Sequence, residues 1–465
     1  MSGPGQVEQE LEEEELTLTA LPDLPLLRVL SHLSGEDLLS VGRVCIRLCE
    51  LTRGHPSLWW GKKASIRASI DSEELLLDML QATPACADLR LELHVDADHN
   101  KIWGVRGFYF FFSKTCSDEL DEADVGNRAR SLSLLIMCSV NYSEYGASVI
   151  RKLGSRTKSI DFKSECIRLD EIFDSLQNAT SLETLSVDWH YDCMVPPLKC
   201  FKTLQKLHSV TIQFCPANKD SGFPDLRLFS QLLEAHGDQL RCVRLLTHDA
   251  VPLLDACPSG LHRLTVVAKK GVLAKLERMR HLSELVFAGY PPPAPSELAT
   301  FLRTWQGPPL RLAVRQCDTE LVRALGAAVS VTHLELGGWD WGCIGESGLR
   351  ALPAVLPALP RLQSLVLFAS DLVSDVFREL ASGPVLSLLF LNDIQTSVCR
   401  DLVLRNSTSL HVVNRSVDEN FRCKVILFGR HPEAGLESCS VCAEVRSLIK
   451  QECRTPRYVC CEQSD

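Results

Sequence analysis

A short leucine pattern recurs through most of the chain and constrains its fold more than any other feature. The pattern is L-x-x-L-x-L, and ten copies, some of them degenerate, occur between residues 182 and 410. The copies begin at Leu182, Leu207, Leu240, Leu261, Leu282, Pro309, Val331, Leu362, Leu386 and Leu410. Their mean spacing is about 25 residues, so the sequence predicts a stack of similar units.

Each copy predicts one short strand followed by a return segment. Alternating leucines of a strand point to one face, and the residues between them point to the other face. The stretch 345–367 then shows a helical spacing of apolar residues, a proline break and the next strand. One such unit cannot bury its apolar face alone, so the units must stack. We therefore predict an α/β fold in which residues 181–420 form a leucine-rich-repeat solenoid, a curved parallel sheet with helices on its convex side.

The segment before this array is less regular. The stretches "DLRLELHV" from Asp88 and "SLSLLIM" from Ser131 resemble strands, whereas "GFYFFF" and the acidic "SDELDEAD" interrupt any fixed spacing. We predict that residues 63–180 hold degenerate early repeats with an acidic loop near 113–128.

The amino-terminal residues divide into an acidic tail and a helical stretch. Residues 1–16 are rich in glutamate, which predicts a disordered, solvated tail. Within residues 17–62, Asp23 can cap a first helix with Pro25 in its first turn. Ser34 can cap the next helix, whose apolar spacing continues to the stop at residues 54–56. These short helices are too few to form a self-sufficient core, so part of their apolar surface must cover another surface.

The order of residues in this helical stretch resembles a known family. Its pattern runs through Leu21-Pro22, Leu26-Leu27, Val29-Leu30, Leu33, Asp37-Leu38, Val44-Cys45 and Leu58-Trp59. This pattern closely resembles the F-box, a three-helix module that docks onto the Skp adaptor of cullin-based ubiquitin ligases. It departs from the family at Leu24-Pro25, where an acidic and an aliphatic residue are usual, and at Leu48, where Trp or Phe is usual. The alternative is a helical hairpin that caps the following repeats.

The resemblance implies a function and a set of contact residues. The chain would be the substrate-recognition component of a Skp-cullin-F-box ubiquitin ligase, and it would act by holding a substrate near a conjugating enzyme without catalytic residues of its own. The residues expected to bind the adaptor are Leu21, Pro22, Leu26, Leu27, Leu30, Leu33, Asp37 and Leu38. Those expected to hold the module together are Val41, Val44, Leu48 and Leu58. The repeats also resemble the variant of F-box proteins in which Cys or Asn follows the strand, as at Cys215 and Cys317.

Large and charged residues on or beside the predicted strands are candidates for substrate binding. They are Trp189, Arg244, Arg263, Glu284, His333, Glu335, Trp339, Phe368 and Phe390. Aromatic side chains on a concave face can anchor a partner, and mixed charge suits a protein partner better than a polyanion. The alternative is that the aromatic residues pack between neighbouring repeats.

Several other classes of function find no support in the sequence. We find no phosphate-binding glycine loop, nucleophile elbow or H-E-x-x-H motif. The net charge of −10 gives no reason to expect nucleic acid as a partner. No apolar run approaches the roughly 18 residues that cross a bilayer, and no signal-peptide pattern is present, so we expect a cytoplasmic or nuclear protein that does not enter a membrane.

The carboxy-terminal residues 421–465 are rich in cysteine and are expected to cap the array. Cys439 and Cys442 form C-x-x-C, and Cys453, Cys460 and Cys461 follow, but the later spacing is too wide for a zinc ribbon. We therefore predict reduced thiols, with no metal and no cofactor. Two alternative functions stay open: a leucine-rich-repeat scaffold or inhibitor without ligase association, and a metal- or redox-sensing regulator that uses these cysteines.

Overall fold

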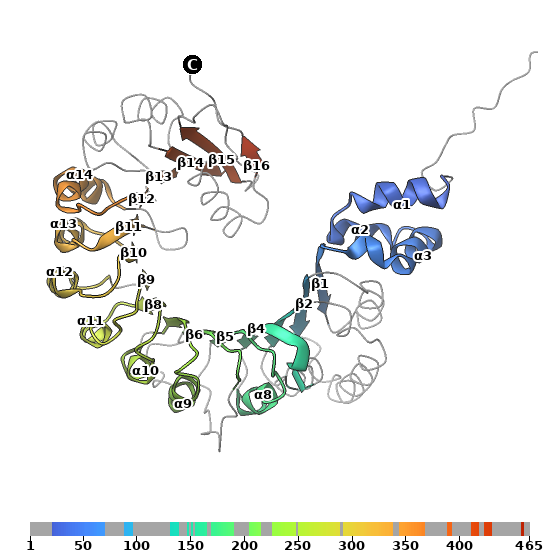
Figure 1. Ribbon diagram of the computed structural model, residues 1–465, viewed down its shortest axis with the longest axis horizontal. Helices are drawn as coiled ribbons and strands as arrows, with labels where there is room; N and C mark the ends of the chain where they lie inside the picture. The colour runs from blue at the N-terminus through green and yellow to red at the C-terminus, as the bar shows by residue number, and fades with distance from the viewer. Residues whose placement is uncertain are drawn as a thin grey trace, which may run out of the picture. The chain divides into compact units, whose positions relative to one another are not determined.

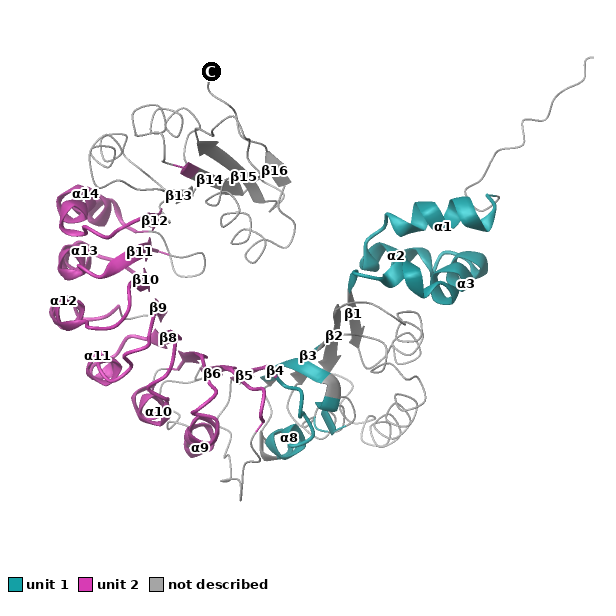
Figure 2. Cartoon of the chain, in the orientation of Figure 1, with its two compact units in different colours: residues 1–182 teal, residues 183–465 magenta. Residues whose placement is uncertain are grey.

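The structure is a computed structural model in which two compact units are described separately. The units are Met1–Leu182 and Glu183–Asp465 (Figure 2). The described residues are 21–69, 88–95, 131–138, 147, 150–151, 154–164, 169–189, 204–214, 226–247, 250–288, 292–337, 344–367, 388–392, 411–417, 423–429 and 457–459. The acidic tail, the loop near 113–128 and the carboxy-terminal cysteines lie outside them.

The first unit begins with the predicted helical module. Its helices are α1 (Asp23–Ser31), α2 (Gly35–Val41) and α3 (Ile46–Gly54), followed by the 3-10 turn η2 (Pro56–Trp59) (Figure 1). The predicted Ser34 cap is confirmed, because the Ser34 side chain accepts a hydrogen bond from the Asp37 N–H at 3.1 Å. The predicted Asp23 cap is wrong. Pro22 occupies the cap position of α1, and the Asp23 carboxylate instead accepts a hydrogen bond from Arg47 at 2.7 Å.

The apolar spacing after Ser34 predicted one helix, but the structure divides it into α2 and α3. Gly42 is the C-cap residue of α2, and Cys45, the N-cap residue of α3, has an extended backbone. A Cβ atom at Gly42 would lie only 2.7 Å from Oγ1 of Thr52. The absence of a side chain at position 42 therefore lets the end of α2 approach α3 closely.

Four parallel strands follow the module in the first unit. They are β1 (Lys63–Ser69), β2 (Asp88–Val95), β3 (Ser131–Cys138) and β4 (Thr157–Ser164), paired in chain order. The two stretches that resembled strands, from Asp88 and from Ser131, are β2 and β3. The 3-10 turn η4 (Gly154–Arg156) precedes β4, and helix α8 (Leu169–Leu176) follows it.

The second unit contains one strand for each of the ten leucine patterns. The strands are β5 (Thr184–Trp189), β6 (Ser209–Phe214), β7 (Cys242–Leu246), β8 (Arg263–Val267), β9 (Glu284–Ala288), β10 (Leu310–Val314), β11 (Val331–Leu336), β12 (Ser364–Leu367), β13 (Leu388–Asn392) and β14 (His411–Val417). All neighbours from β5 to β14 pair in parallel. This arrangement confirms the predicted parallel-sheet repeat fold.

Helices and 3-10 turns return the chain between these strands. They are α9 (Arg227–Ala235), α10 (Ala250–Ala256), α11 (Val272–Leu276), α12 (Pro295–Thr304), α13 (Thr319–Ala324), η5 (Leu325–Ala327), α14 (Glu346–Val355) and η6 (Leu356–Ala358). Helices α9 to α14 lie along the outer, convex side of the sheet of this unit (Figure 1). The predicted placement of the helices is therefore confirmed for this unit.

Strand register aligns the apolar residues of successive repeats into two buried ladders. The first ladder is Val210, Val243, Leu264, Leu285, Leu312, Leu334 and Leu365. The second is Ile212, Leu245, Val266, Phe287, Val314, Leu336 and Leu367. Each of these side chains is at most 2% exposed, so the core is continuous from repeat to repeat.

The sheet continues beyond the predicted solenoid, into the residues 421–465 that were assigned to a cysteine-rich cap. Strand β15 (Cys423–Gly429) pairs antiparallel with β14, and β16 (Arg457–Val459) pairs in parallel with β15. Only residues 418–422 connect β14 to β15. A connection this short suits a hairpin, because a parallel crossover needs a dozen or more residues.

A buried histidine ties two neighbouring repeats together. Nε2 of His236, just after α9, accepts a hydrogen bond from the Leu204 N–H at 2.9 Å, and its Nδ1 lies 2.8 Å from the Leu232 carbonyl oxygen. Nδ1 must therefore carry the proton, and the ring is neutral. Burial lowers the pKa of His236, although its bond to Leu232 opposes that shift. Gln239 completes the contact by donating to the Leu204 carbonyl at 2.5 Å.

This histidine gives the fold a testable dependence on pH. Because its folded-state pKa is lowered, the unfolded chain binds the proton first, and stability falls as the pH drops below about 6.5. The loss from this one group is at most about 1.4 kcal/mol at pH 5.5. Urea unfolding of the natural chain and of His236→Gln at pH 7.5 and 5.5 measures how much free energy of unfolding each protein loses between the two pH values. The variant should be less stable at pH 7.5 and should lose less stability at pH 5.5. An equal loss in both proteins would contradict this role.

Candidate functional site

The helical module closes around a buried tryptophan. Trp59 has no exposed surface, and its Nε1 donates a hydrogen bond to the Thr52 carbonyl at 2.9 Å. The hydroxyl of Thr52 in turn donates to the Leu48 carbonyl at 2.9 Å. The other side chains buried around this centre are Leu26, Leu30, Leu38, Leu39, Leu48, Leu51 and Leu58. The ring of Trp59 thus fills the module while its polar N–H remains satisfied.

Burial revises the predicted division between core and contact residues. Leu26, Leu30 and Leu38, predicted to bind the adaptor, are 0–1% exposed, so they contact no partner while the module keeps this fold. Leu26 and Leu30 stand four residues apart in α1 and share its inward face. Conversely, Val44 was expected in the core and is 71% exposed, because it lies in the turn between α2 and α3. Leu48 and Leu58 are buried, and Val41 is half-buried.

The remaining predicted contact residues lie at the surface of the module. Leu21, Leu27 and Leu33 are half-buried, and Pro22 and Asp37 are exposed. The Asp37 carboxylate accepts a hydrogen bond from the Ser34 hydroxyl at 2.7 Å, so it also stabilises the start of α2. The contact role of these five residues stays a prediction.

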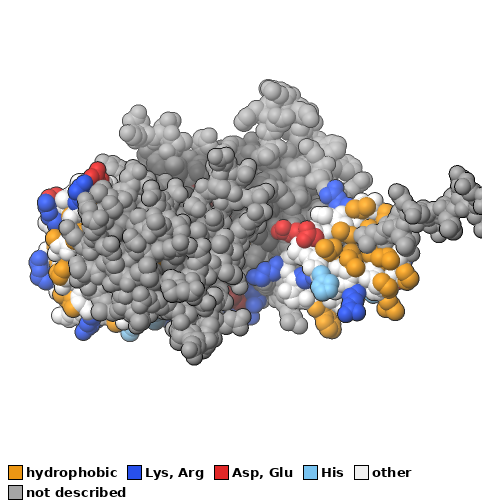
Figure 3. Space-filling model, turned by 90° about the horizontal axis from the view of Figure 1, so that it is seen from above, with side chains coloured by type: hydrophobic (Ala, Val, Ile, Leu, Met, Phe, Trp, Pro, Cys, Tyr) orange, Lys and Arg blue, Asp and Glu red, His pale blue; other side chains and the backbone are white. Residues whose placement is uncertain are grey.

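The module exposes large apolar side chains that were not among the residues predicted to bind the adaptor. They are Leu24 (80% exposed), Val29 (44%), Val44 (71%), Ile46 (80%) and Trp60 (74%). Within the part of the chain that the structure describes, only one other large hydrophobic residue is exposed, Val329 in the second unit. Figure 3 shows hydrophobic side chains gathered at the surface of the module. The available sequence signal for Leu24, Val29 and Ile46 was that they fall outside the inward helical spacing.

Two basic side chains hold the segments that carry these exposed residues. Arg47 of α3 donates both to the Leu21 carbonyl and to the Asp23 carboxylate, each at 2.7 Å, and so fixes the start of α1. Lys62 donates to the Ser31 carbonyl at 2.9 Å and also to the Leu33 carbonyl, near the end of α1. Lys62 follows Trp60 by two residues, so these bonds hold the chain after Trp60 against the end of α1. The exposed apolar residues are therefore carried on a fixed scaffold.

An open hollow adjoins the turn between α2 and α3. Its volume is about 490 Å³, and Ile46 and Cys49 line it together with Arg43, Glu50 and Arg53. The hollow combines apolar and charged walls, a combination common at protein interfaces.

The sheet of the second unit brings together most of the predicted substrate-binding residues. Register places Arg263, Glu284 and His333 in one row, and Arg244 and Glu335 in the next, on the side opposite the buried ladders. Arg263 pairs with Glu284 at 2.7 Å. Glu335 pairs with Arg315, also at 2.7 Å. The face therefore has the mixed charge that the sequence predicted, with part of that charge paired internally.

Two of the predicted aromatic anchors have described backbone positions, and register places them on opposite faces of the sheet. Trp189 stands in register with Phe214, which belongs to the buried side of β6, so its backbone position is not on the concave side as predicted. Phe390 stands in register with Val366, which in turn pairs with Glu335, so its backbone position lies in the row of Arg244 and Glu335, as predicted. Trp339 and Phe368 lie outside the described residues.

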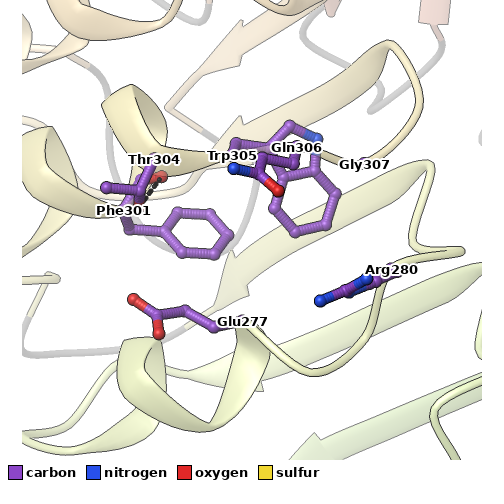
Figure 4. A pocket seen from close by; sticks show the side chains of 7 residues that line it. All are labelled: Glu277, Arg280, Phe301, Thr304, Trp305, Gln306 and Gly307. Atoms are coloured by element: carbon purple, nitrogen blue, oxygen red, sulfur yellow. Dashed lines mark hydrogen bonds between the residues drawn. The ribbon is translucent and has the colours of Figure 1, made fainter.

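Aromatic side chains also line a hollow near α12 on the helical side. Its volume is about 300 Å³. The rings of Phe301 and Trp305 lie side by side above Glu277 and Arg280 in Figure 4, with ring centroids 5.3 Å apart. Nε1 of Trp305 donates to the Pro308 carbonyl at 3.0 Å, which fixes the ring. This arrangement can accept a side chain of a protein partner, and the leucine template contained no signal for it.

Two buried cysteines of the second unit, Cys257 and Cys317, are unreactive thiols. Burial raises the pKa of Cys257 and of Cys317 to about 12, so both thiols stay protonated near neutral pH. Among the described residues, no group of three or more histidine, cysteine or acidic side chains could hold a metal ion. In the same part of the chain, no helix is long and apolar enough to span a bilayer.

Comparison with known proteins identifies the module. The F-box-like family matches residues 18–60, so these residues form an F-box-like domain. No curated protein matches the chain.

Two solved structures are similar to the chain at low sequence identity. One is the crystal structure of the Rad7 and Elc1 complex in yeast, with 13% identity and a TM-score of 0.37, covering 80% of this chain and 86% of that chain. The other is the crystal structure of a TLR13–ssRNA13 complex, with 11% identity and a TM-score of 0.36, covering 80% of this chain and 45% of that chain.

The close contact at Gly42 predicts how the module responds to substitution. Gly42→Ala places a Cβ against Thr52 Oγ1, whose position is fixed by its bond to Leu48, and should destabilise α2 and α3 by about 1–3 kcal/mol. Thr52→Ala removes the clashing atom, so the double variant should lose less stability than the sum of the two single losses. Hydrogen exchange of the α2 and α3 amides in the full chain measures this coupling. Additive losses would contradict the contact.

Proposed function

We propose that this chain is the substrate-recognition component of a Skp-cullin-F-box ubiquitin ligase. The F-box-like domain would bind the Skp adaptor, and the repeat array would bind the protein to be modified. The observation that carries this proposal is the concentration of exposed apolar side chains on residues 21–60. A fixed set of exposed apolar residues on a small domain is typical of a surface that becomes buried in a complex.

The energetics support a protein partner for the module. Full burial of one large aliphatic or aromatic side chain contributes roughly 1.5–3 kcal/mol. Leu24, Ile46 and Trp60 are each at least 74% exposed, so most of this contribution remains available to a partner. Their fixed backbone reduces the entropy lost on binding.

The repeat array is suited to holding a protein substrate. Its sheet carries both arginine and glutamate side chains, and the ion pairs Arg263–Glu284 and Arg315–Glu335 fix some of them in place. Fixed charges of both signs favour a partner of complementary pattern and disfavour others. Under this proposal the chain contributes no catalytic group, and it accelerates ubiquitin transfer by raising the effective concentration of the substrate near the conjugating enzyme.

Substitution of the exposed residues tests adaptor binding. Leu24→Glu and Ile46→Glu place a charge in the proposed contact surface, and both positions lie in the first turn of a helix, where an acidic residue is favourable for folding. At least one of them should reduce recovery of the Skp adaptor by about tenfold or more, equivalent to about 1.4 kcal/mol. Co-purification from cells or with the purified adaptor measures the recovery. Leu21→Ala with Pro22→Ala tests the residues predicted from the sequence.

Val329→Glu is the matched control, because it introduces the same charge at an exposed apolar residue of the second unit. Adaptor recovery should be unchanged by that substitution. If the natural chain recovers no adaptor, the ligase assignment is wrong and the alternative is a leucine-rich-repeat scaffold or inhibitor. Recovery that is unchanged in every variant would show that this surface is not the adaptor contact.

A further inference from the structure

A groove runs along α12 on the helical side of the second unit. Three hollows with volumes of about 300, 460 and 300 Å³ lie in a row, and each shares wall residues with the next. Glu297 lines the first and the second hollow, and Phe301 lines the second and the third. The hollows therefore form one groove that follows α12 from its first turn to Trp305, a length of about 15 Å.

The groove is open because the neighbouring helix is short. Helix α11 has 5 residues and α12 has 10, so α11 covers only part of the side of α12 that faces it. Leu273 and Phe301 form the floor of the central hollow and are 6% and 3% exposed. Ala274 and Thr300 stand at its rim and are exposed. A side chain that enters this hollow contacts both helices.

A fixed tryptophan forms the far end of the groove. Trp305 is half-buried, and the hydrogen bond of its Nε1 holds the ring beside Phe301. A Cβ atom at Gly307 would overlap Cζ2 of Trp305, so the ring takes this position only because residue 307 is glycine. Figure 4 shows Phe301 and Trp305 on one side of the hollow, with Glu277 and Arg280 on the other. An aromatic ring that is held in place before binding can anchor a partner at a low cost in entropy.

Unpaired charges of both signs surround the groove. The charged residues that line it are Lys269, Lys270, Glu277, Arg280 and Glu297. None of these five side chains makes an ion pair or a hydrogen bond with the described part of the chain, whereas nearby Lys275 pairs with Asp255 at 2.7 Å. Three cations and two anions nearly cancel, so the groove can select a partner by the order of charges but not by net charge. Both glutamates line the central hollow, whereas Arg280 lines only the aromatic end.

We propose that this groove docks an amphipathic helix of a protein partner. Glu297, Phe301 and Trp305 stand four residues apart, so one face of α12 lines all three hollows at intervals of about 6 Å. Side chains on one face of a docked helix recur at the same interval. An extended peptide suits the groove less well, because the helical walls offer its backbone no row of pairing partners, whereas a helix satisfies its own backbone.

The lining residues specify the side chains of the docked helix. An apolar residue would lie against Trp305, and a basic residue one turn away would lie between Glu277 and Glu297. The inference goes beyond the proposed function, because the groove lies on the helical side of the second unit, away from its sheet face (Figure 1). It gives the chain a further binding surface, separate from the F-box-like domain and from the proposed substrate face.

Selection from a displayed library of helical peptides tests the proposal on the purified full chain. The probes are peptides of about 18 residues, or five helical turns, in an alanine and glutamine frame with three positions of one face randomised, each four residues from the next. We expect the selected peptides to carry an apolar residue at one of these positions and Lys or Arg at the next. Ala274→Arg fills the central hollow from its exposed rim and should weaken a labelled selected peptide by about tenfold in fluorescence anisotropy.

Ala354→Arg is the matched control, because Ala354 is also an exposed alanine within a helix, in α14, and does not line the groove. It should change the dissociation constant by less than about twofold. Glu277→Lys should weaken the same peptide, and a peptide with Glu in place of its basic residue should restore the binding. Binding without defined contacts would show no such exchange.

Several results would overturn the proposal. They are the absence of any selected peptide, selected peptides without the helical spacing, and equal weakening by Ala274→Arg and Ala354→Arg. A dimer of the chain in light scattering that Ala274→Arg dissociates would assign the groove to a second copy and would also overturn it. Adaptor recovery in the pull-down is measured separately, so failure here leaves the proposed function intact.

Discussion

The stacking of apolar ladders in the second unit is the constraint on which the repeat fold depends. Each strand contributes two inward residues, and the core exists only because the next strand continues both rows, as Leu264 and Val266 continue Val243 and Leu245. No single repeat could bury these side chains alone. The same register places polar residues such as Arg244 on the opposite face, where they are free of packing demands. Core residues and surface residues thus alternate along each strand.

The helical module, unlike the repeats, has one closed core. It is small, and most of its apolar residues pack in that core around Trp59. Its hydrogen bond to Thr52 and the close approach at Gly42 leave little freedom in that core. The apolar residues that do not fit inside, such as Leu24 and Ile46, remain at the surface. A domain of this size gains little stability by itself, and a partner that covers these residues adds to it.

Much of the fold could be predicted from the sequence, whereas the site could be predicted only in part. The leucine template located ten strands because its spacing reflects a core that repeats in every unit. Helical spacing showed which residues share a face in the module, but it could not show which face meets the core. For that reason Leu26 and Leu30 were assigned to the surface and Val44 to the interior. The close approach of Gly42 to Thr52 joins residues ten positions apart, and no local pattern contains it.

Hydrogen exchange of the full chain with and without the purified Skp adaptor would locate the adaptor-binding surface. If the module binds the adaptor, exchange slows in peptides from residues 21–62, which include the exposed apolar residues, and stays unchanged in the strands from β6 to β12. Such a result would place the adaptor on the F-box-like domain and keep the repeat face available for a substrate. Unchanged exchange in the module at saturating adaptor, or slowed exchange confined to the repeats, would mean that the module is not the adaptor-binding site.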